Sequence, residues 1–274
     1  MEVRHSETIA RGERFSFGLN WTSFLSCLDD HRIAEAENSL KAMLNVSDLL
    51  GKRFLDIGCG SGLFSLAARR LGAEVHSFDY DPQSVACARE LKRRFFQDDK
   101  LWTVQEGSAL DEPYIDRLGQ FDVVYSWGVL HHTGSMMQGL RNAQKPVKQG
   151  GLLFIAIYND QGMASQLWTI VKKTYCSGAF GRYAVSAIFI PAFALISIAQ
   201  GLVKYGNPMG DFTNYKRKRG MSVYHDWIDW LGGYPFEVAK PETIILFYHA
   251  LGFRLLNLRT TNRLGCNQFV FERM

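Results

Sequence analysis

Residues 54–62 read Phe54-Leu55-Asp56-Ile57-Gly58-Cys59-Gly60-Ser61-Gly62. The stretch begins with the mostly apolar character of a strand buried in a parallel sheet. Its glycines permit a tight turn that a ligand can approach closely. A helical pattern follows at residues 63–71, and the start of that helix would present free N–H groups at the turn. The segment therefore predicts a strand, a glycine turn and a helix beside a ligand.

The spacing of the three glycines separates two kinds of ligand. Dinucleotide-binding turns follow the pattern G-x-G-x-x-G, whereas Gly58, Gly60 and Gly62 bring the third glycine one residue early. Asp56 also stands directly before the turn. A carboxylate there would repel a pyrophosphate, but it suits a ligand that carries ammonium and sulfonium groups. A plain tight turn between strand and helix is the structural alternative for this motif alone.

A second carboxylate follows at the interval expected for a ribose contact. The strand predicted at 74–78 ends at Asp79, 21 residues after Gly58. In sheets of this kind, a carboxylate about 20 residues after the first glycine binds ribose hydroxyls. Capping of the next helix is the alternative role, but Asp81 is better placed for it. The loop at 106–111 follows the third strand at the same sheet edge and suits an adenine ring.

Short apolar runs alternate with helical patterns along most of the chain, which predicts a parallel sheet with right-handed crossovers. The last two strands are expected to close the sheet as an antiparallel pair. The predicted fold class is α/β, with a seven-stranded, mostly parallel sheet and helices on both faces. We expect strands at 53–57, 74–78, 102–105, 121–126, 152–158, 254–259 and 268–271, and helices at 63–71, 82–96, 136–147 and 241–251.

The alternation stops for about 80 residues after the fifth strand, far more than an ordinary loop. We therefore expect one ligand-binding domain formed by residues 51–158 and 241–274. Residues 159–240 form a largely helical insertion that acts as a lid, acceptor or dimer element. Residues 1–50 form an N-terminal arm, with a helix predicted from Trp21 to Leu50.

Five motifs in this order resemble those of the class I S-adenosylmethionine-dependent methyltransferases. They are FLDIGCGSG at 54–62, VHSFDYDP at 75–82, EGSALDEP at 106–113, FDVVYSWGVLHH at 121–132 and GGLLFIAIY at 150–158. The resemblance is closest to the branch with ubiquinone-biosynthesis and natural-product small-molecule methyltransferases. It covers about residues 50–158 and the last three dozen. It implies a Rossmann-like fold, S-adenosyl-L-methionine as donor and S-adenosyl-L-homocysteine as product, but it does not fix the acceptor. Because the insertion is rich in aromatic residues, we expect O-methylation of a small apolar or amphipathic molecule.

The same resemblance implies a set of donor-binding residues. Asp56 and the first two glycines would line the methionine part, and Asp79 would bind the ribose hydroxyls. Ser108 and Ala109 would flank the adenine, although the family more often has Asp where Ser108 stands. The full expected set is Asp56, Gly58, Gly60, Gly62, Asp79, Tyr80, Ser108, Ala109 and Trp127.

Acceptor-side chemistry needs a positioned acceptor and, for a hydroxyl, a base. His132 follows the fourth strand at the ligand edge and is a candidate base, with a purely structural role as the equal alternative. For His131 we expect only a hydrogen bond to a neighbouring loop. On a predicted helix, His225 and Asp229 lie one turn apart, so the Asp229 carboxylate could orient His225 as a base. The alternative is an ordinary pair of side chains on a solvated helix. No metal is predicted, because Asp226 and these two residues lack a further ligand set.

Residues 183–203 are uncharged over 21 positions between Arg182 and Lys204. That length allows a membrane span. Pro191 at the centre and a polar stripe with Ser186, Ser197 and Gln200 argue against a span and favour a one-sided helix. Arg182 and Lys204 lie on the same stripe. We expect a lid or a homodimer contact first, peripheral membrane contact second and a span last.

Composition bounds the remaining possibilities. A net charge of +4 is too small to indicate a nucleic-acid partner, and none is expected. Five widely spaced cysteines and a polar N-terminus indicate a reducing, cytoplasmic setting with possible membrane association. The rival functions are a nicotinamide oxidoreductase, a nucleic-acid or protein methyltransferase, and a non-catalytic binding protein of the same fold. Residues 126–129 lack the Asn-Pro-Pro-aromatic motif of nucleic-acid amino methylases.

Overall fold

The computed structural model describes residues 5–18, 21, 25, 28–210, 212 and 223–274, and the side chains of 5, 223–226 and 229 lie outside that description. A seven-stranded sheet has the order β3-β2-β1-β4-β5-β7-β6. β7 runs antiparallel to both of its neighbours, and the other pairings are parallel. The mostly parallel sheet and the antiparallel pairing of the last two strands were predicted. The strands are β1 Arg53–Ile57, β2 Glu74–Asp79, β3 Trp102–Glu106, β4 Phe121–Trp127, β5 Val147–Tyr158, β6 Phe253–Arg259 and β7 Cys266–Arg273.

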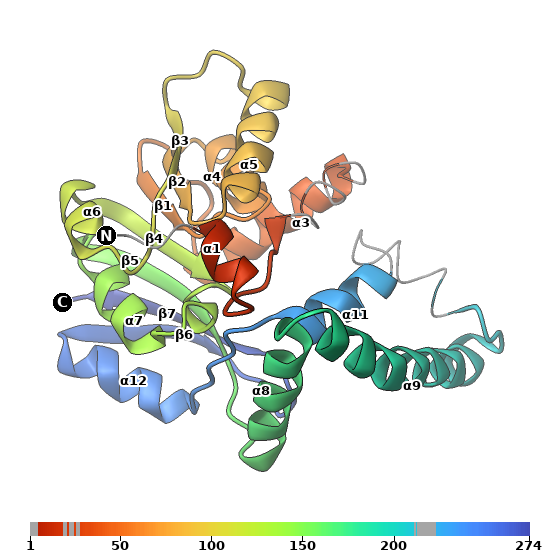
Figure 1. Ribbon diagram of the computed structural model, residues 1–274. Coiled ribbons are helices and arrows are strands. Elements are labelled where there is room, and N and C mark those ends of the chain that lie inside the picture. Colours follow the sequence, from red (N-terminus) through yellow and green to blue (C-terminus); the bar gives the residue numbers. More distant parts are fainter. Residues whose placement is uncertain (1–4, 19–20, 22–24, 26–27, 211, 213–222) are drawn as a thin grey trace.

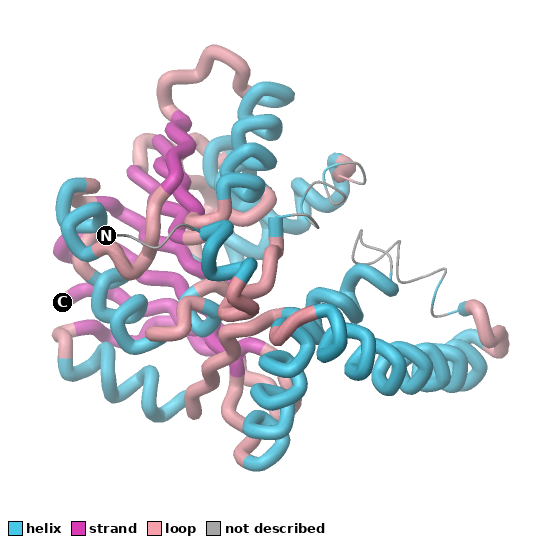
Figure 2. The backbone as a smooth tube through the Cα atoms, in the orientation of Figure 1, coloured by secondary structure: helices cyan, strands magenta, loops and turns pink. Residues whose placement is uncertain are grey.

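Helices cover both faces of the sheet (Figures 1 and 2). One face carries α3 (Asp30–Leu44), α4 (Leu63–Arg70) and α5 (Pro82–Phe95). The other carries α6 (Glu112–Arg117), α7 (Met136–Gln144) and α12 (Pro241–Ala250). The short α6 was not predicted; it begins where the Asp111 side chain accepts a hydrogen bond from the Tyr114 N–H.

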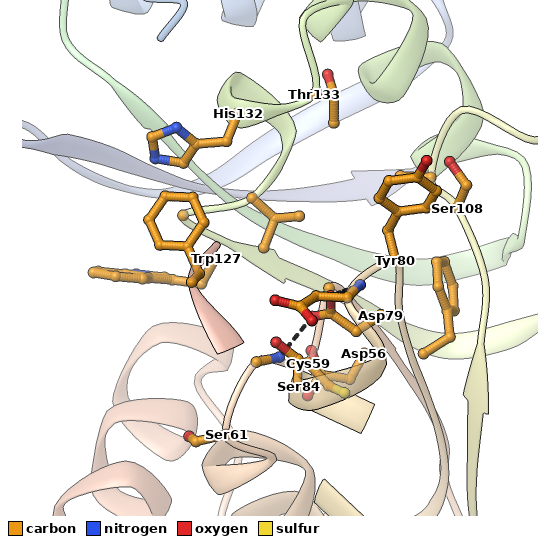
Figure 3. Close-up of a pocket in the computed structure, with 18 of the residues that line it drawn as sticks. Asp56, Cys59, Ser61, Asp79, Tyr80, Ser84, Ser108, Trp127, His132 and Thr133 are labelled. Carbon is orange, nitrogen blue, oxygen red and sulfur yellow. Dashed lines mark hydrogen bonds between the residues drawn. The ribbon is translucent and has the colours of Figure 1, made fainter. Parts of the chain in front are cut away.

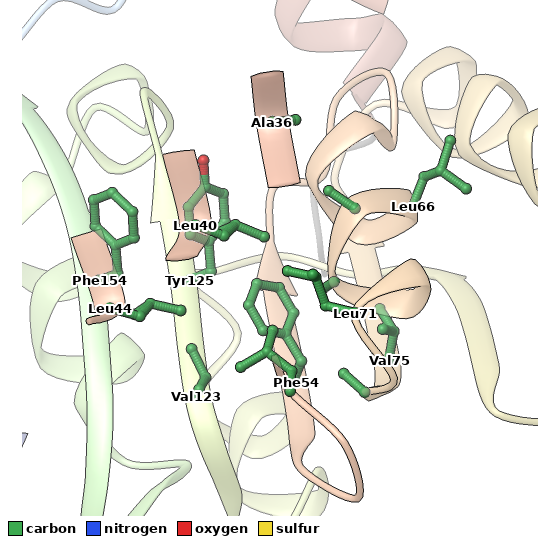
Figure 4. Close-up of a cluster of buried hydrophobic side chains, with 14 of the residues drawn as sticks. Ala36, Leu40, Leu44, Phe54, Leu66, Leu71, Val75, Val123, Tyr125 and Phe154 are labelled. Carbon is green, nitrogen blue, oxygen red and sulfur yellow. The ribbon is translucent and has the colours of Figure 1, made fainter. Parts of the chain in front are cut away.

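Alternate residues of the central strands feed two separate cores, because successive side chains of a strand point to opposite faces. Phe54 and Tyr125 belong to the core beneath α3 and α4 (Figure 4). Their neighbours Leu55 and Val124 belong to the core beneath α7 and α12. The nearly continuous burial of β1 follows from this double packing.

The N-terminal helical region is interrupted rather than continuous. After a short α1 (His5–Ala10), the described residues Gly18, Trp21 and Leu25 are helical, residues 28 and 29 are not, and α3 starts at Asp30. Asp29 has an extended backbone and accepts from the Arg32 N–H, and Asn45 ends the helix in the left-handed conformation. The predicted helix from Trp21 to Leu50 is therefore interrupted at residues 28 and 29 and ends at Leu44, because these two capping residues bound α3.

The insertion after β5 is helical in its described parts. It comprises α8 (Met163–Cys176), α9 (Ala179–Tyr205) and α11 (Val223–Gly232). α9 continues through Pro191 and extends away from the sheet (Figure 1). Within the described residues, α9 is the one helix that is long and apolar enough to cross a membrane, judged by length and composition.

Candidate functional site

A pocket of about 1150 Å³ lies at the carboxyl ends of β1, β2 and β4, the edge where open parallel sheets bind ligands (Figure 3). The glycine turn, the ends of these strands and the N-terminal segment contribute its wall. The structure brings eight of the nine expected donor residues together there: Asp56, Gly58, Gly60, Asp79, Tyr80, Ser108, Ala109 and Trp127.

Gly62, the ninth, does not belong to the pocket lining. It caps α4 with φ of 81°, and a Cβ there would lie 2.8 Å from the Cα of Ala88 on α5. The expectation that Gly62 contacts the donor is therefore corrected: this glycine lets α4 and α5 pack closely.

Asp56 is held by a buried polar network. Its Oδ2 accepts from the Ser65 hydroxyl at 2.5 Å, and Ser65 lies 2.7 Å from the hydroxyl of Ser77. Ser77 in turn accepts from Trp102 Nε1 at 2.9 Å. Burial of the carboxyl, which is only 2% exposed, raises the pKa of Asp56 to about 7.

Asp79 ties the glycine turn to the end of β2. One carboxylate oxygen accepts from the Gly60 N–H at 2.9 Å and the other from the Asp81 N–H at 2.9 Å. Burial raises the pKa of Asp79 to about 6, while these hydrogen bonds and the nearby Arg14 oppose the shift. The turn itself is anchored because Gly58 and Cys59 both donate N–H groups to the Phe78 carbonyl.

The two carboxylates make the glycine end of the pocket receptive to a positive charge. Desolvation raises the pKa of both, because water no longer stabilises the charged forms. A ligand cation placed between them would restore that stabilisation. Arg14 lies near Asp79, but its guanidinium packs over the Tyr80 ring at 5.2 Å and donates to the carbonyls of His132 and Thr133.

The opposite end of the pocket is aromatic. The Phe17 and His132 rings lie 5.0 Å apart, and the Tyr158 ring lies 5.5 Å from His132 and 6.0 Å from Trp230. All four residues line the pocket. Such a wall suits a flat or apolar molecule beside the donor position.

His132 is neutral in this setting. Its Nδ1 lies 2.7 Å from the Pro235 carbonyl, so this nitrogen carries the proton and Nε2 keeps a lone pair. Burial lowers the pKa of His132 to about 3, with Lys172 and Arg14 adding to the shift. His131 plays the expected structural role, since its Nδ1 accepts from the Tyr158 N–H.

His225 and Asp229 fall on α11, but their side chains lie outside the described residues. Their pairing remains a prediction. α11 does reach the pocket, because Trp230 on the same helix lines it.

The insertion contacts the pocket through α11 and not through the helix that was expected to be the lid. Of its described residues, Trp230 of α11 lines the pocket, and none of α8 or α9 does. No described residue of 183–203 lines the pocket, and a lid role for this segment stays a prediction. Of the predicted polar stripe, Ser197 is buried against the protein, Ser186 is half-buried and Gln200 is exposed.

Two parts of the wall were missed from the sequence. Tyr158 ends β5, and the turn before β7 supplies residues 264–266. The place of Tyr158 at the carboxyl end of a predicted strand was a usable signal. The turn reaches the pocket because the buried amides of Asn267 and Asn159 hydrogen-bond at 3.0 Å, a contact that spacing does not reveal.

Residues 55–153 match the family model described as a methyltransferase domain. The sheet order and the site at the strand ends agree with that match. These residues form a class I S-adenosylmethionine methyltransferase domain.

Curated relatives match the same region of the methyltransferase domain. A ubiquinone biosynthesis O-methyltransferase of Xanthomonas oryzae pv. oryzae is 34% identical over 137 residues, 49% of this chain and 54% of that protein. One from Parvibaculum lavamentivorans is 32% identical over 132 residues, 47% of this chain and 49% of that protein. The chain thus spans about half the length of the curated relatives it matches.

Solved structures share the fold over nearly the whole chain. Magnesium protoporphyrin IX methyltransferase from Synechocystis PCC 6803 with bound SAH has a TM-score of 0.56 at 14% identity and covers 98% of this chain and 100% of its own. An O-methyltransferase family protein from Burkholderia thailandensis has a TM-score of 0.54 at 13% identity, over 89% of this chain and 57% of its own. At these identities the likeness shows the fold of the methyltransferase domain.

Proposed function

We propose that this protein transfers a methyl group from S-adenosylmethionine to a hydroxyl of a small apolar or amphipathic molecule. One observation carries the proposal: two buried carboxylates with raised pKa values face one pocket beside a glycine turn. A dinucleotide would bring negative phosphates to this place, whereas the methyl donor brings positive charge.

The pocket residues fit the donor part by part. Asp56 would face the ammonium group, and the backbone of Gly58 and Gly60 would border the methionine chain. Asp79 would accept from the ribose hydroxyls, and Ser108 and its neighbour would border the adenine. The bound donor supplies an electrophilic methyl group, so the protein mainly has to align the acceptor with it.

The aromatic end would hold the acceptor. His132 presents a neutral ring whose Nδ1–H is held by a carbonyl, which leaves Nε2 to accept a hydrogen bond from a hydroxyl. A pKa of about 3 makes it a weak base, so we propose that His132 mainly orients the acceptor. His225 with Asp229 remains the alternative base.

We place the enzyme in the cytoplasm.

Donor binding tests the proposal without knowledge of the acceptor. Calorimetry with S-adenosylhomocysteine should show binding by the wild type. Asp79→Ala should weaken it by about 1.5–3 kcal/mol, because a charge-assisted hydrogen bond to the ribose is lost. Asp98→Ala, an exposed carboxylate next to β3, is the matched control and should bind like the wild type. Tight binding of NADH together with no binding of S-adenosylhomocysteine would overturn the proposal.

The acceptor side can be tested with labelled donor and a panel of phenols that carry alkyl chains. If His225 is the base, His225→Gln should reduce turnover by about 10²–10⁴-fold and leave donor affinity intact. His132→Gln should raise KM more than it lowers kcat, since its role is orientation. The opposite pattern would make His132 the base.

A further inference from the structure

α9 packs one face against its own protein and leaves the other in solvent. Val185, Phe189, Phe193 and Ser197 recur every four residues and form the packed face. The Trp168 ring lies 5.4 Å from Phe189 and 6.3 Å from Phe193. The packed face is thus filled by aromatic side chains of the insertion itself.

The opposite face is apolar and exposed. Ile188, Leu195 and Leu202 recur every seven residues, so they share one side of the helix. They are 68%, 67% and 50% exposed. We call these three residues, with Pro191 and Ala192 between them, the outer face. A row of large aliphatic side chains in water marks an interaction surface, because monomeric proteins rarely expose a long apolar patch.

The charge of this region is one-sided. Residues 161–210 contain no Asp or Glu and four basic residues, namely Lys172, Lys173, Arg182 and Lys204. All 27 acidic residues of the chain lie elsewhere, where they balance the remaining 27 basic residues. The net charge of +4 therefore resides in the segment that carries the outer face. Arg182 and Lys204 are exposed near the two ends of the helix.

We propose that the outer face of α9 docks this protein onto an anionic lipid bilayer, with the helix lying in the plane of the membrane surface. Aliphatic side chains would enter the boundary between head groups and acyl chains, while the acid-free, positively charged segment 161–210 as a whole would be attracted to anionic head groups. A second copy of the chain would place like charges of two such segments together, which disfavours a dimer through this face.

The packed face argues for an in-plane helix rather than a span. A spanning helix meets lipid all round, so α9 would have to leave the aromatic contacts with α8 and α11. An in-plane helix keeps those contacts and buries only the side that is already free. The docking does not depend on methyl transfer.

Vesicle sedimentation tests the docking. The full chain is mixed with vesicles of phosphatidylcholine alone or with phosphatidylglycerol added. Binding should require the anionic lipid and decline with salt. Leu195→Glu should reduce it about tenfold or more, since a charge replaces a leucine that would be buried in lipid. Leu246→Glu on α12 is the matched control, because Leu246 is equally exposed at 66% and should bind normally.

Three results would overturn the proposal. The first is equal binding by Leu195→Glu and Leu246→Glu. The second is no vesicle binding together with a dimer, seen by sedimentation velocity, that Leu195→Glu dissolves. The third is protein that resists extraction by alkali and high salt and needs detergent, which indicates a span. Binding of S-adenosylhomocysteine by Leu195→Glu should equal that of the wild type, so this proposal and the proposed function can fail independently.

Discussion

Asp56 and Asp79 show how single residues couple ligand chemistry to stability. Both carboxyls are buried by the strands and helices around them, and their hydrogen bonds only partly replace lost water. In the folded chain without ligand, each carboxyl therefore holds its proton more tightly than an exposed aspartate does. The pKa rises to about 7 for Asp56 and to about 6 for Asp79. Stability from such a group is present below its unfolded pKa and is lost as pH rises through the folded pKa.

Asp56→Asn should stabilise the ligand-free protein near neutral pH and above. The amide keeps the shape and still accepts from Ser65, but no charge is buried. We expect the free energy of unfolding to rise by about 1 kcal/mol or more at pH about 8, with little difference near pH 4. Urea denaturation at both pH values measures this. Equal stability of the two proteins at the higher pH would contradict it.

Donor affinity should depend on pH through the same two groups. A cationic donor needs both carboxylates ionised, so the affinity for S-adenosylmethionine should be highest about one pH unit above the pKa of Asp56 and fall as pH decreases through the pKa values of Asp56 and Asp79. We expect a loss of about tenfold or more between roughly pH 8 and 5.5 by calorimetry. In Asp56→Asn the remaining dependence should lie near Asp79's lower pKa. A flat profile for the wild type would refute the charge argument.

At the scale of the element, the turn after β1 depends on space as well as on backbone conformation. Gly58 and Gly128 have almost the same φ, 75° and 76°. A Cβ on Gly58 would lie 2.3 Å from the Val129 side chain, whereas nothing lies within 4 Å of one on Gly128. An added Cβ would therefore cause only backbone strain at Gly128, whereas at Gly58 it would cause the same strain and also a steric clash.

Gly128→Ala should therefore destabilise the protein by about 1–2 kcal/mol, the penalty for a left-handed alanine. Gly58→Ala adds the clash and should cost distinctly more, and it should also abolish binding of S-adenosylhomocysteine. Urea denaturation and calorimetry on both variants measure the difference. Equal destabilisation would mean that Val129 simply moves aside.

Over the whole molecule, the N-terminal arm closes one side of the pocket. The Phe15 N–H donates to the Tyr234 carbonyl, and the Gly18 N–H donates to Asp81. Arg14 reaches the carbonyls of His132 and Thr133. The arm is thereby joined to β2, to the loop after β4 and to the insertion, although these segments are far apart in sequence.

Arg14→Met should loosen the arm and speed release of the bound product. Two charge-assisted hydrogen bonds are lost, while the apolar volume is largely kept, so we expect dissociation of S-adenosylhomocysteine to be about five- to tenfold faster. The exposed Arg11 gives the control Arg11→Met. Stopped-flow measurement that finds both variants equal to the wild type would mean that the arm does not retain the ligand.

The sequence by itself determined the mostly parallel seven-stranded sheet and the donor end of the pocket. Asp56, the first two glycines and Asp79 follow predicted strands at their carboxyl ends, and parallel pairing with right-handed crossovers brings those ends together. Only the tertiary structure decided that Gly62 packs against α5, that His132 is neutral, that Tyr158 and residues 264–266 complete the wall, and that α9 turns its aliphatic side outward. These outcomes depend on which distant surfaces meet: burial sets a pKa, and contact with α8 and α11 selects the packed face of a helix, whereas local periodicity records neither.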